Sequence, residues 1–393
     1  MLMSFLDSPS PPKRVLIAGG GIAAVEAALA LRALAGDRVR LTLISPDPVF
    51  QYRAAATLAA FDDRIPIRYD LHAIAADVGA VYQKTLVKSV APKKRYVRTA
   101  SGARLEYDAL ILATGARAIA GIPGAMTFRD QRDLRLIRRV FADVESGAVA
   151  RVVFAVPTGV SWPLPMYELA LLLAARATER GLDTEVSLVT PEHEPLEVFG
   201  THASELVRGL LEDGGVRFIG ATAASGVRRD GALMLHAEGP MIRADRVVAT
   251  PRLRGRRIVG VPATRWGFVP VHAYGRVDGI EDVYAAGDVT TFPVKQGGLA
   301  AQQADRIAHT IAAGAVASTK QLRARHVLLA RLVGGATPLI LRTELDAWGR
   351  PGAAQLERID KHGVTGSNKV LARYLTPYLA TRDPLPAYPP EAA

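Results

Sequence analysis

The chain has 393 residues, enough for two or three domains, and its 49% hydrophobic and 22% charged residues are typical of a globular protein rather than a disordered one. The absence of cysteine excludes disulfides, thiolate metal sites, cysteine-held iron–sulfur clusters and any cysteine redox relay. The net charge of +11 favours anionic ligands, but no nucleic-acid motif accompanies it and the histidines lack metal-ligand spacing, so we expect neither a nucleic-acid partner nor a metal site.

The first predicted elements form a strand–helix–strand unit. Residues 15–18 are a short apolar run that predicts a buried strand, residues 22–34 predict an Ala/Leu-rich helix, and residues 39–44 alternate like a second strand. The turn after the first strand reads Gly-Gly-Gly-Ile-Ala-Ala at residues 19–24. It fits the dinucleotide-binding pattern G-x-G-x-x-G/A in the required strand–turn–helix context.

Each small residue of this turn has its own expected task. Gly19 permits the tight turn, Gly21 leaves room for a pyrophosphate, and Ala24 lets the helix pack closely on the strand. Ile22 and Ala23 begin the helix, whose unpaired N–H groups and positive dipole end suit phosphates. We therefore predict all five as cofactor-binding residues.

The end of the second strand departs from this pattern. An acidic residue is expected there to bind a ribose hydroxyl, but the chain has Ser45, followed by Pro46 and Asp47. We predict Ser45 as the ribose contact, with Asp47 close enough in the sequence to reach the same group. The alternative is that residues 45–48 form only a turn.

A second, weaker unit starts in mid-chain. Residues 151–156 predict a strand, residues 166–180 a helix and residues 185–190 another strand. A further strand at 283–286 and a long helix at 298–313 follow.

These elements predict an α/β fold with two Rossmann-like, three-layer dinucleotide-binding domains, the second inserted in the first. The expected boundaries are 13–120 and 270–317 for the first domain, 121–269 for the second, and 318–393 for a C-terminal cap or interface segment.

Two later motifs complete a pattern with the glycine turn. Residues 107–115 are an apolar strand that ends in Ala-Thr-Gly, and residues 283–288 are a strand that ends in Gly-Asp. The three motifs in this order resemble the FAD-dependent pyridine nucleotide-disulfide oxidoreductase superfamily. The resemblance implies that Ala113, Thr114 and Gly115 lie near FAD. It also implies that Gly287 lets the backbone approach the ligand, and that Asp288 binds the ribityl chain of the flavin.

Within that superfamily the chain is most similar to the branch of type II NADH dehydrogenases and sulfide:quinone oxidoreductases. The similarity lies in Phe-Gln-Tyr-Arg at 50–53 and Phe-Pro-Val-Lys-Gln-Gly-Gly at 292–298. It implies that Arg53, Lys295, Gln296 and Gly298 contact the cofactor, with Lys295 near the flavin pyrimidine, where positive charge stabilises reduced flavin. The alternative for the lysine segment is a solvated loop.

The second glycine motif is broken. Aligned with the usual pattern, Phe154 and Val156 occupy the first two glycine positions and only Gly159 remains, so NAD(P)H binding is doubtful. Sulfide:quinone oxidoreductases also lose these glycines and place a cysteine near position 161 or 162. Because this chain has no cysteine, a persulfide mechanism is excluded.

A rigid, Pro-rich loop stands in that place and opens the next helix. We hypothesise that Trp162 flanks the flavin and that Tyr167 and Glu168 line the approach of the electron donor. The alternative is a proline-fixed helix start with Trp162 in the domain core. Trp162, Glu168 and Lys295 are the candidate catalytic residues.

The predicted function is an FAD-dependent oxidoreductase that passes electrons from an unidentified small-molecule donor through non-covalent FAD to an acceptor. A quinone is one candidate, because residues 300–304 are similar to the Ala/Gln-rich helix that lines a quinone site, although such helices are common. Two alternatives stay open. One is a flavin-dependent oxidase or tailoring enzyme that uses oxygen, and the other is a non-catalytic flavin-binding protein.

The remaining segments bear on partners and location. The basic amphipathic stretch at 369–375 is compatible with docking at a membrane surface, with covering the flavin, or with a dimer contact. The arginine run at 252–257 is interpreted as a solvated loop. Since neither a signal peptide nor an apolar run of spanning length is recognisable, we expect a cytoplasmic protein, with peripheral membrane docking as an alternative.

Overall fold

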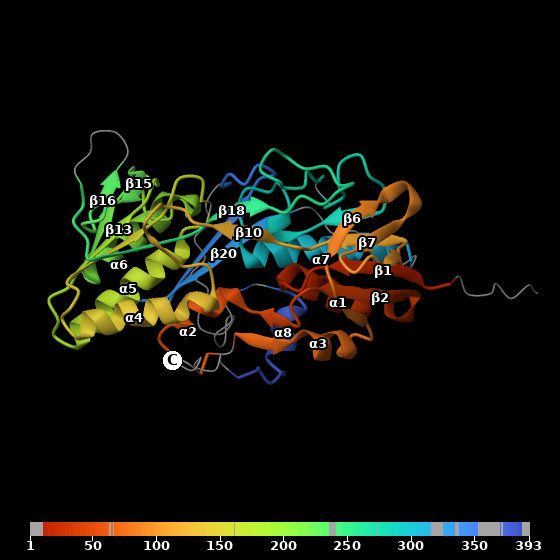
Figure 1. Cartoon of the computed structure of the whole chain (residues 1–393), viewed down its shortest axis with the longest axis horizontal. Helices are drawn as coiled ribbons and strands as arrows, with labels where there is room; N and C mark the ends of the chain where they lie inside the picture. The colour runs from red at the N-terminus through yellow and green to blue at the C-terminus, as the bar shows by residue number, and fades with distance from the viewer. Residues whose placement is uncertain are drawn as a thin grey trace, which may run out of the picture.

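The computed structural model describes the chain except for both ends and some internal segments. The described residues are 11–62, 64–65, 67–160, 162–235, 241–272, 274–315, 325–334, 338–352, 370 and 372–386. They form an elongated molecule with one α/β half at each end (Figure 1).

The first half is built on a five-stranded parallel sheet of order β19-β9-β1-β2-β5. Its strands are β1 (Lys13–Ala18), β2 (Val39–Ser45), β5 (Val81–Lys84), β9 (Ala109–Leu112) and β19 (Val283–Ala285). Two helices, α1 (Ile22–Ala35) and α7 (Gly297–Ala313), pack against each other on one face of the sheet (Figure 1).

The side chains of β1 alternate between the two faces of the sheet, and each face is covered by another layer. Val15 and Ile17 point to the helices, whereas Leu16 and Ala18 point to the opposite face. That face is covered by an antiparallel sheet of three strands, β6 (Val87–Ala91), β7 (Tyr96–Thr99) and β8 (Arg104–Glu106).

Between β2 and β5 the chain makes a small lateral layer. It consists of the antiparallel strands β3 (Val49–Gln51) and β4 (Arg68–Asp70), the short helix α2 (Ala56–Ala59), and α3 (Leu71–Asp77), which Asp70 caps through the N–H groups of His72 and Ala73. Helix α2 contacts the second half of the molecule.

The second half repeats the parallel-sheet design. Its sheet has the order β11-β17-β12-β13-β14, with β11 (Met126–Thr127), β12 (Arg151–Ala155), β13 (Glu185–Val189), β14 (Val216–Ile219) and β17 (Arg246–Ala249). The helices α4 (Leu134–Glu145), α5 (Leu164–Glu179) and α6 (Thr201–Asp213) share a core with one face, and the hairpin β15 (Ala224–Val227)–β16 (Leu233–Leu235) covers the other.

A two-stranded antiparallel ribbon joins the halves. The chain leaves the first sheet through β10 (Ala116–Ile119) and returns through β18 (Arg252–Gly255), and these two strands pair with each other. The predicted α/β fold with two Rossmann-like domains, one inserted in the other, is thus confirmed.

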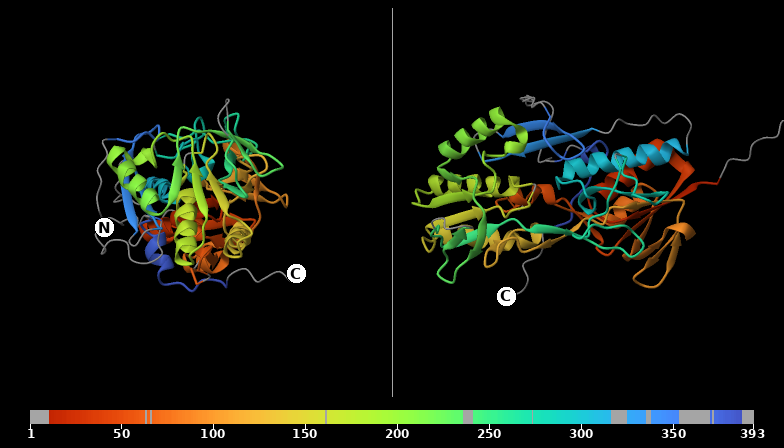
Figure 2. Two further views of the ribbon diagram at one scale, coloured as in Figure 1. Left: turned by 90° about the vertical axis from the view of Figure 1, so that its left-hand side faces the viewer. Right: turned by 90° about the horizontal axis from the view of Figure 1, so that it is seen from above.

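The C-terminal part spans both halves. The hairpin β20 (His326–Leu332)–β21 (Leu339–Leu345) contacts α7 of the first half and α5 of the second, and lies along one side of the molecule (Figure 2, right). The predicted amphipathic stretch at 369–375 lies partly outside the described residues. What is described includes α8 (Leu375–Leu379), whose two end residues are buried and which packs on α1.

Val370, Ala372 and Leu375 of this stretch are buried against the rest of the protein. No helix in the described part of the molecule is long and apolar enough to cross a bilayer.

One buried carboxylate fastens this C-terminal segment to α1. Glu26 accepts hydrogen bonds from the backbone N–H groups of Tyr374 at 3.1 Å and Leu375 at 2.6 Å. Burial raises the pKa of Glu26 to about 7, although the two backbone hydrogen bonds act to lower it.

This pKa gives a signed pH dependence of stability. Because folded Glu26 binds its proton more tightly than the unfolded residue, its contribution is present below pH 4.5 and is lost as the pH rises through about 7. Between pH 4.5 and 8 the difference in unfolding free energy between the wild type and Glu26→Gln should therefore fall by up to about 3 kcal/mol. Urea unfolding of both proteins across this range measures it, and a difference that does not change with pH would contradict the assignment.

Candidate functional site

A cavity of about 1360 Å³ lies at the carboxyl ends of β1, β2 and β9, between the N-termini of α1 and α7, and reaches the second half of the molecule. The crevice beyond the carboxyl ends of parallel strands is where ligands bind in such sheets. Since single-ligand pockets measure roughly 300–1,000 Å³, this cavity can hold a dinucleotide and a second ligand together.

The glycine turn at 19–21 forms one wall. Gly19 has φ +142°, and a Cβ there would lie 2.1 Å from the carbonyl oxygen of Ala113, so only glycine fits. At Gly21, by contrast, a Cβ would meet no described atom within 4 Å, which leaves the backbone open to the cavity.

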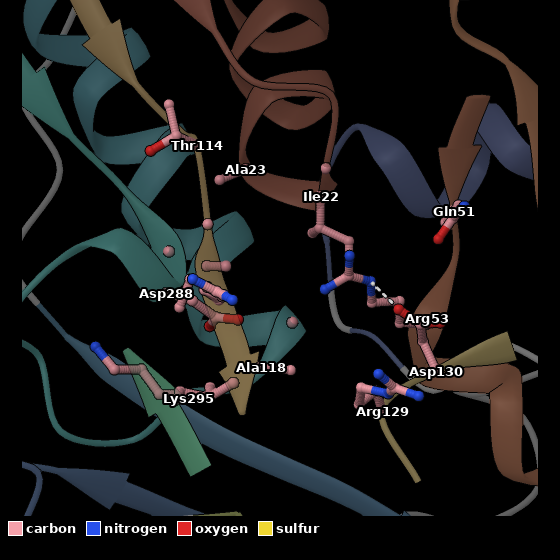
Figure 3. Close-up of a pocket in the computed structure, with 18 of the residues that line it drawn as sticks. Ile22, Ala23, Gln51, Arg53, Thr114, Ala118, Arg129, Asp130, Asp288 and Lys295 are labelled. Atoms are coloured by element: carbon pink, nitrogen blue, oxygen red, sulfur yellow. Dashed lines mark ion pairs between the residues drawn. The ribbon is translucent and has the colours of Figure 1, made fainter. Parts of the chain in front are cut away.

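The head of α1 stands beside this opening. The helix begins at Ile22 with neither a side-chain cap from the described residues nor an acidic residue in its first turn, and Ile22 and Ala23 line the cavity (Figure 3). Its first N–H groups therefore suit an anion. Ala24 is fully buried behind them and does not line the cavity.

The end of β2 behaves as a turn with an acidic side chain beyond it. The Ser45 hydroxyl donates to the Asp47 carbonyl at 2.9 Å and accepts from the Asp47 N–H at 3.3 Å. Ser45 lines the cavity, but its hydroxyl closes the turn. Asp47, which is exposed and also lines the cavity, is the acidic group at this strand end.

The Ala-Thr-Gly segment follows β9 and carries an orphaned polar atom. Ala113, Thr114 and Gly115 line the cavity, and the buried Thr114 hydroxyl has no hydrogen-bond partner among the described residues. A buried hydroxyl without a partner costs about 1–3 kcal/mol. The wall at Thr114 therefore fits a ligand that carries a polar group.

Gly287 and Asp288 follow β19 and line the cavity. Gly287 has φ +78° and donates its N–H to the side-chain oxygen of Gln303 at 2.7 Å. The Asp288 carboxylate accepts no hydrogen bond from the described residues. Burial raises its pKa, and the charges of Lys295 and Arg53 oppose that rise. A half-buried carboxylate with unused acceptors fits the hydroxyls of a polyol chain.

Of the two cations that act on the Asp288 carboxylate, Lys295 has the larger effect on its pKa (Figure 3). Its ammonium donates to the Thr290 carbonyl and lies 4.3 Å from the centre of the Phe268 ring. Burial lowers the pKa of Lys295 to about 8, and the charge of Asp288 opposes this shift.

The neighbours of Lys295 have structural tasks. The Gln296 side chain caps α7 by accepting from the Leu299 N–H at 2.9 Å and donates to the Leu329 carbonyl at 3.2 Å, so its polar atoms are engaged although it lines the cavity. Gly298 is buried in the first turn of α7 and does not line the cavity.

Arg53 reaches across to the second half. It pairs with Asp130 at 3.5 Å (Figure 3), and Asp130 also accepts two hydrogen bonds from Arg132, at 2.9 and 2.7 Å. Burial acts to raise the pKa of Asp130, but the bonds from Arg132 and the charges of both arginines outweigh it and lower the pKa. Sequence reasoning missed Asp130, because a short charged segment has no local pattern that marks a distant partner.

The side of the cavity that faces the second half contains the two other candidate catalytic residues. Trp162 lines it and packs edge-on against Phe199, with ring centres 6.3 Å apart. Glu168 lines it too, is 1% exposed, and accepts a hydrogen bond from the Thr57 hydroxyl of α2 at 2.7 Å. Tyr167 instead lies in the core of the second half and does not line the cavity.

Two of the three glycine positions of the second half are filled by core side chains. Phe154 and Val156 are each 1% exposed, so both are core residues at the end of β12. Helix α5 follows Pro163 and has Pro165 in its first turn, without a side-chain cap from the described residues. Because proline has no N–H, this helix start offers fewer donors to a pyrophosphate than that of α1.

The carboxylate of Glu192, which follows β13 of the second half, is hydrogen-bonded within the protein. Thr190-Pro-Glu192 after β13 corresponds to Ser45-Pro-Asp47 after β2. The Glu192 carboxylate accepts from the hydroxyls of Tyr167 at 2.7 Å and Thr190 at 2.9 Å. Burial raises its pKa to about 7, against the effect of these hydrogen bonds. In the turn after β12, core side chains thus occupy two of the three glycine positions and only Gly159 stays open to the cavity, while the Glu192 carboxylate is already hydrogen-bonded within the protein.

Comparison with known proteins places this geometry in context. The profile of the pyridine nucleotide-disulphide oxidoreductase family matches residues 13–317, which include every predicted cofactor-binding residue. The sulfide-quinone reductase of Aquifex aeolicus is 28% identical over 211 residues, which are 51% of this chain and 48% of that protein. The match thus spans about half the length of that relative.

Two further matches cover more of the chain. The ferredoxin–NAD(+) reductase component of the biphenyl dioxygenase system of Paraburkholderia xenovorans is 30% identical over 301 residues, 72% of this chain and 69% of that protein. The crystal structure of the Aquifex aeolicus sulfide:quinone oxidoreductase superposes with a TM-score of 0.71 at 21% identity and covers 86% of this chain and 88% of that one. At that identity the superposition shows the fold.

The open backbone at Gly21 leads to a prediction on flavin binding. The branched side chain of Gly21→Val would fill the cradle without a clash against the protein, so the fold should be kept while FAD affinity falls by at least about tenfold. Flavin absorbance per chain and circular dichroism measure the two effects. The matched control is Gly209→Ala, in the middle of α6 with open space around it, which should keep its flavin. Wild-type flavin content in Gly21→Val would refute the assignment.

Proposed function

The chain belongs to the pyridine nucleotide-disulphide oxidoreductase family, whose cofactor is FAD, and from this premise we propose that it passes electrons from a small donor that is not a dinucleotide, through non-covalent FAD, to an acceptor. The observation that carries the proposal is the contrast between the two halves. The backbone at Gly21 is open, whereas Val156 fills the equivalent position of the second half and prolines open the helix that follows.

The residues of the first half fit FAD. The turn at 19–23 would hold the pyrophosphate, Asp47 the ribose of the adenosine, Thr114 a polar group of the ligand, and Asp288 the ribityl hydroxyls. When bound, FAD supplies the hydride and electron chemistry that no side chain of this protein can provide.

Lys295 is proposed to keep a positive charge at the cavity floor. Its ammonium donates to the Thr290 carbonyl and lies over the Phe268 ring. The negative charge of Asp288 also acts on it and favours its charged form. A fixed cation in a partly desolvated site stabilises negative charge that develops nearby.

The donor is proposed to approach from the second half, past Trp162 and Glu168. A buried carboxylate in the cavity wall can take a proton when a donor gives up its electrons, and the Thr57 hydroxyl fixes its orientation. Trp162 limits the space beside it. These two side chains would orient a small molecule and exclude water.

A quinone remains our proposal for the acceptor. Its support is the named activity of the Aquifex relative and an apolar wall that contains Phe292, Pro293, Ala300 and Ala330. The predicted Ala/Gln helix contributes little beyond Ala300. The Gln302 side-chain amide donates to the Val327 carbonyl of β20 at 2.8 Å and accepts from the Val327 N–H at 2.9 Å, and Gln303 accepts from the Gly287 N–H.

Anaerobic spectroscopy of the flavin-loaded protein tests the proposal. We expect NADH and NADPH to bleach the flavin slowly or not at all, and sulfide to leave it oxidised because no cysteine is present. After chemical reduction, a soluble quinone should reoxidise the flavin much faster than oxygen does.

The other outcomes select the alternatives. Rapid bleaching by NADH contradicts the proposed donor class. Faster reoxidation by oxygen points to an oxidase, and a flavin that neither quinone nor oxygen reoxidises in turnover points to a non-catalytic flavin-binding protein.

Lys295 provides a pH-dependent prediction. As the pH rises through about 8 the ammonium loses its charge, so the midpoint potential of the bound flavin should fall more steeply above that pH. Lys295→Met should lower the potential at pH 7 by roughly 30 mV, the equivalent of a tenfold change in a two-electron equilibrium, and remove the extra slope. Spectroelectrochemical titration measures both. Lys88→Met, an exposed lysine on β6, is the matched control and should behave as wild type.

A further inference from the structure

Five arginines and a tryptophan lie on or next to the ribbon that joins the two halves. We call this the arginine–tryptophan patch. Its members are all exposed: Arg117 on β10, Arg254 on β18, and Arg256, Arg257, Arg265 and Trp266 in the segment that follows.

The register of the ribbon places like charges together. Arg117 lies directly opposite Arg254 on the paired strand, an arrangement that destabilises a sheet. No arginine of the patch forms an ion pair with any residue that the structure describes. Elsewhere, exposed arginines have such partners, as in the pair Arg151–Asp245 at 2.9 Å. A solvated loop does not require this concentration of uncompensated charge.

The cations are held in place by the tryptophan and by backbone contacts. The guanidinium groups of Arg254 and Arg265 lie 5.6 and 5.1 Å from the centre of the Trp266 ring, which is itself 50% exposed. Arg257 donates to the carbonyls of Thr264 and Arg265, at 3.1 and 3.2 Å.

The turn that carries Trp266 is pressed against β18. The Gly255 N–H donates to the Trp266 carbonyl at 3.0 Å, and a Cβ at Gly255 would lie 2.1 Å from the Gly267 carbonyl oxygen. The patch is therefore preorganised, which lowers the entropy lost when a ligand binds.

A hollow of about 300 Å³ lies within the patch. It is lined by Arg254, Gly255, Arg257, Arg265, Trp266 and Gly267, and it is at the lower end of the size range of ligand pockets. Three of these arginines enter it from different points of the chain. A tetrahedral oxyanion can accept from several guanidinium groups that are not coplanar, whereas a planar carboxylate is suited to one or two.

We propose that the arginine–tryptophan patch is a second anion site, which binds a phosphate-bearing polyanion. It is distinct from the FAD cavity, because Arg254, Arg265 and Trp266 do not line that cavity. Arg257 lines both the hollow and that cavity, whereas Arg117 and Arg256 line the cavity but not the hollow, so the occupant would sit at the rim of the flavin site. The anion would offset the repulsion between Arg117 and Arg254.

The test uses the full, FAD-loaded chain and three proteins: wild type, Arg254→Gln/Arg265→Gln, and the control Arg217→Gln. Arg217 is an exposed arginine on β14 that has no described ion pair. Sodium pyrophosphate, with sodium chloride at equal ionic strength as reference, is titrated by calorimetry and by thermal unfolding. A parallel arm measures sedimentation with vesicles of anionic phospholipid.

In wild type and the control, pyrophosphate should raise the melting temperature by several degrees. The double variant should lose most of that gain and bind pyrophosphate at least about tenfold more weakly. All three proteins should have the same flavin content, which separates this site from the FAD site.

The two arms identify the source of the phosphate. Binding of pyrophosphate that depends on Arg254 and Arg265 supports a small ligand. Vesicle binding with the same dependence, and no pyrophosphate binding, supports the phosphate groups of a lipid surface. Equal responses of all three proteins in both arms, or no response, would overturn the proposal.

Discussion

The contact between the Gly19 backbone and the carbonyl of Ala113 is the constraint on which the rest of the site depends. With 2.1 Å between that oxygen and the position of a Cβ, no side chain can separate the turn from the end of β9. This closeness brings the open backbone at Gly21 and the uncapped start of α1 next to Thr114. A phosphate cradle and an unsatisfied hydroxyl thus share one cavity wall, as a dinucleotide requires.

The second half shows what happens to the same fold when this constraint is absent. Val156 fills the core where a bare turn would be needed, prolines open α5, and the Glu192 carboxylate is bound by Tyr167. The sheet and helices persist because their apolar periodicity does not depend on the ligand. Through Trp162 and Glu168, this half contributes a wall to the cavity.

Local patterns predicted the parts of the molecule that local interactions determine. The strands and helix around the glycine turn, and the long helix after residue 297, agree with the structure to within two residues, because alternation and helical periodicity are properties of the segment itself. The pairs Thr57–Glu168 and Arg53–Asp130 join segments far apart in the chain, and no spacing announces them. The hydrogen bonds between the Ser45 hydroxyl and Asp47 belong to the turn at 45–48, which the sequence also offered as the alternative to a ribose contact.

The central claim is that the two halves differ: the first binds FAD and the second binds no dinucleotide. The most direct measurement is the stoichiometry and affinity of both nucleotides in one sample, with the flavin quantified by absorbance after denaturation and NADH titrated calorimetrically into the flavin-loaded protein. The account predicts one releasable FAD per chain and no saturable NADH binding. Saturable NADH binding in the micromolar range, with FAD retained, would contradict it.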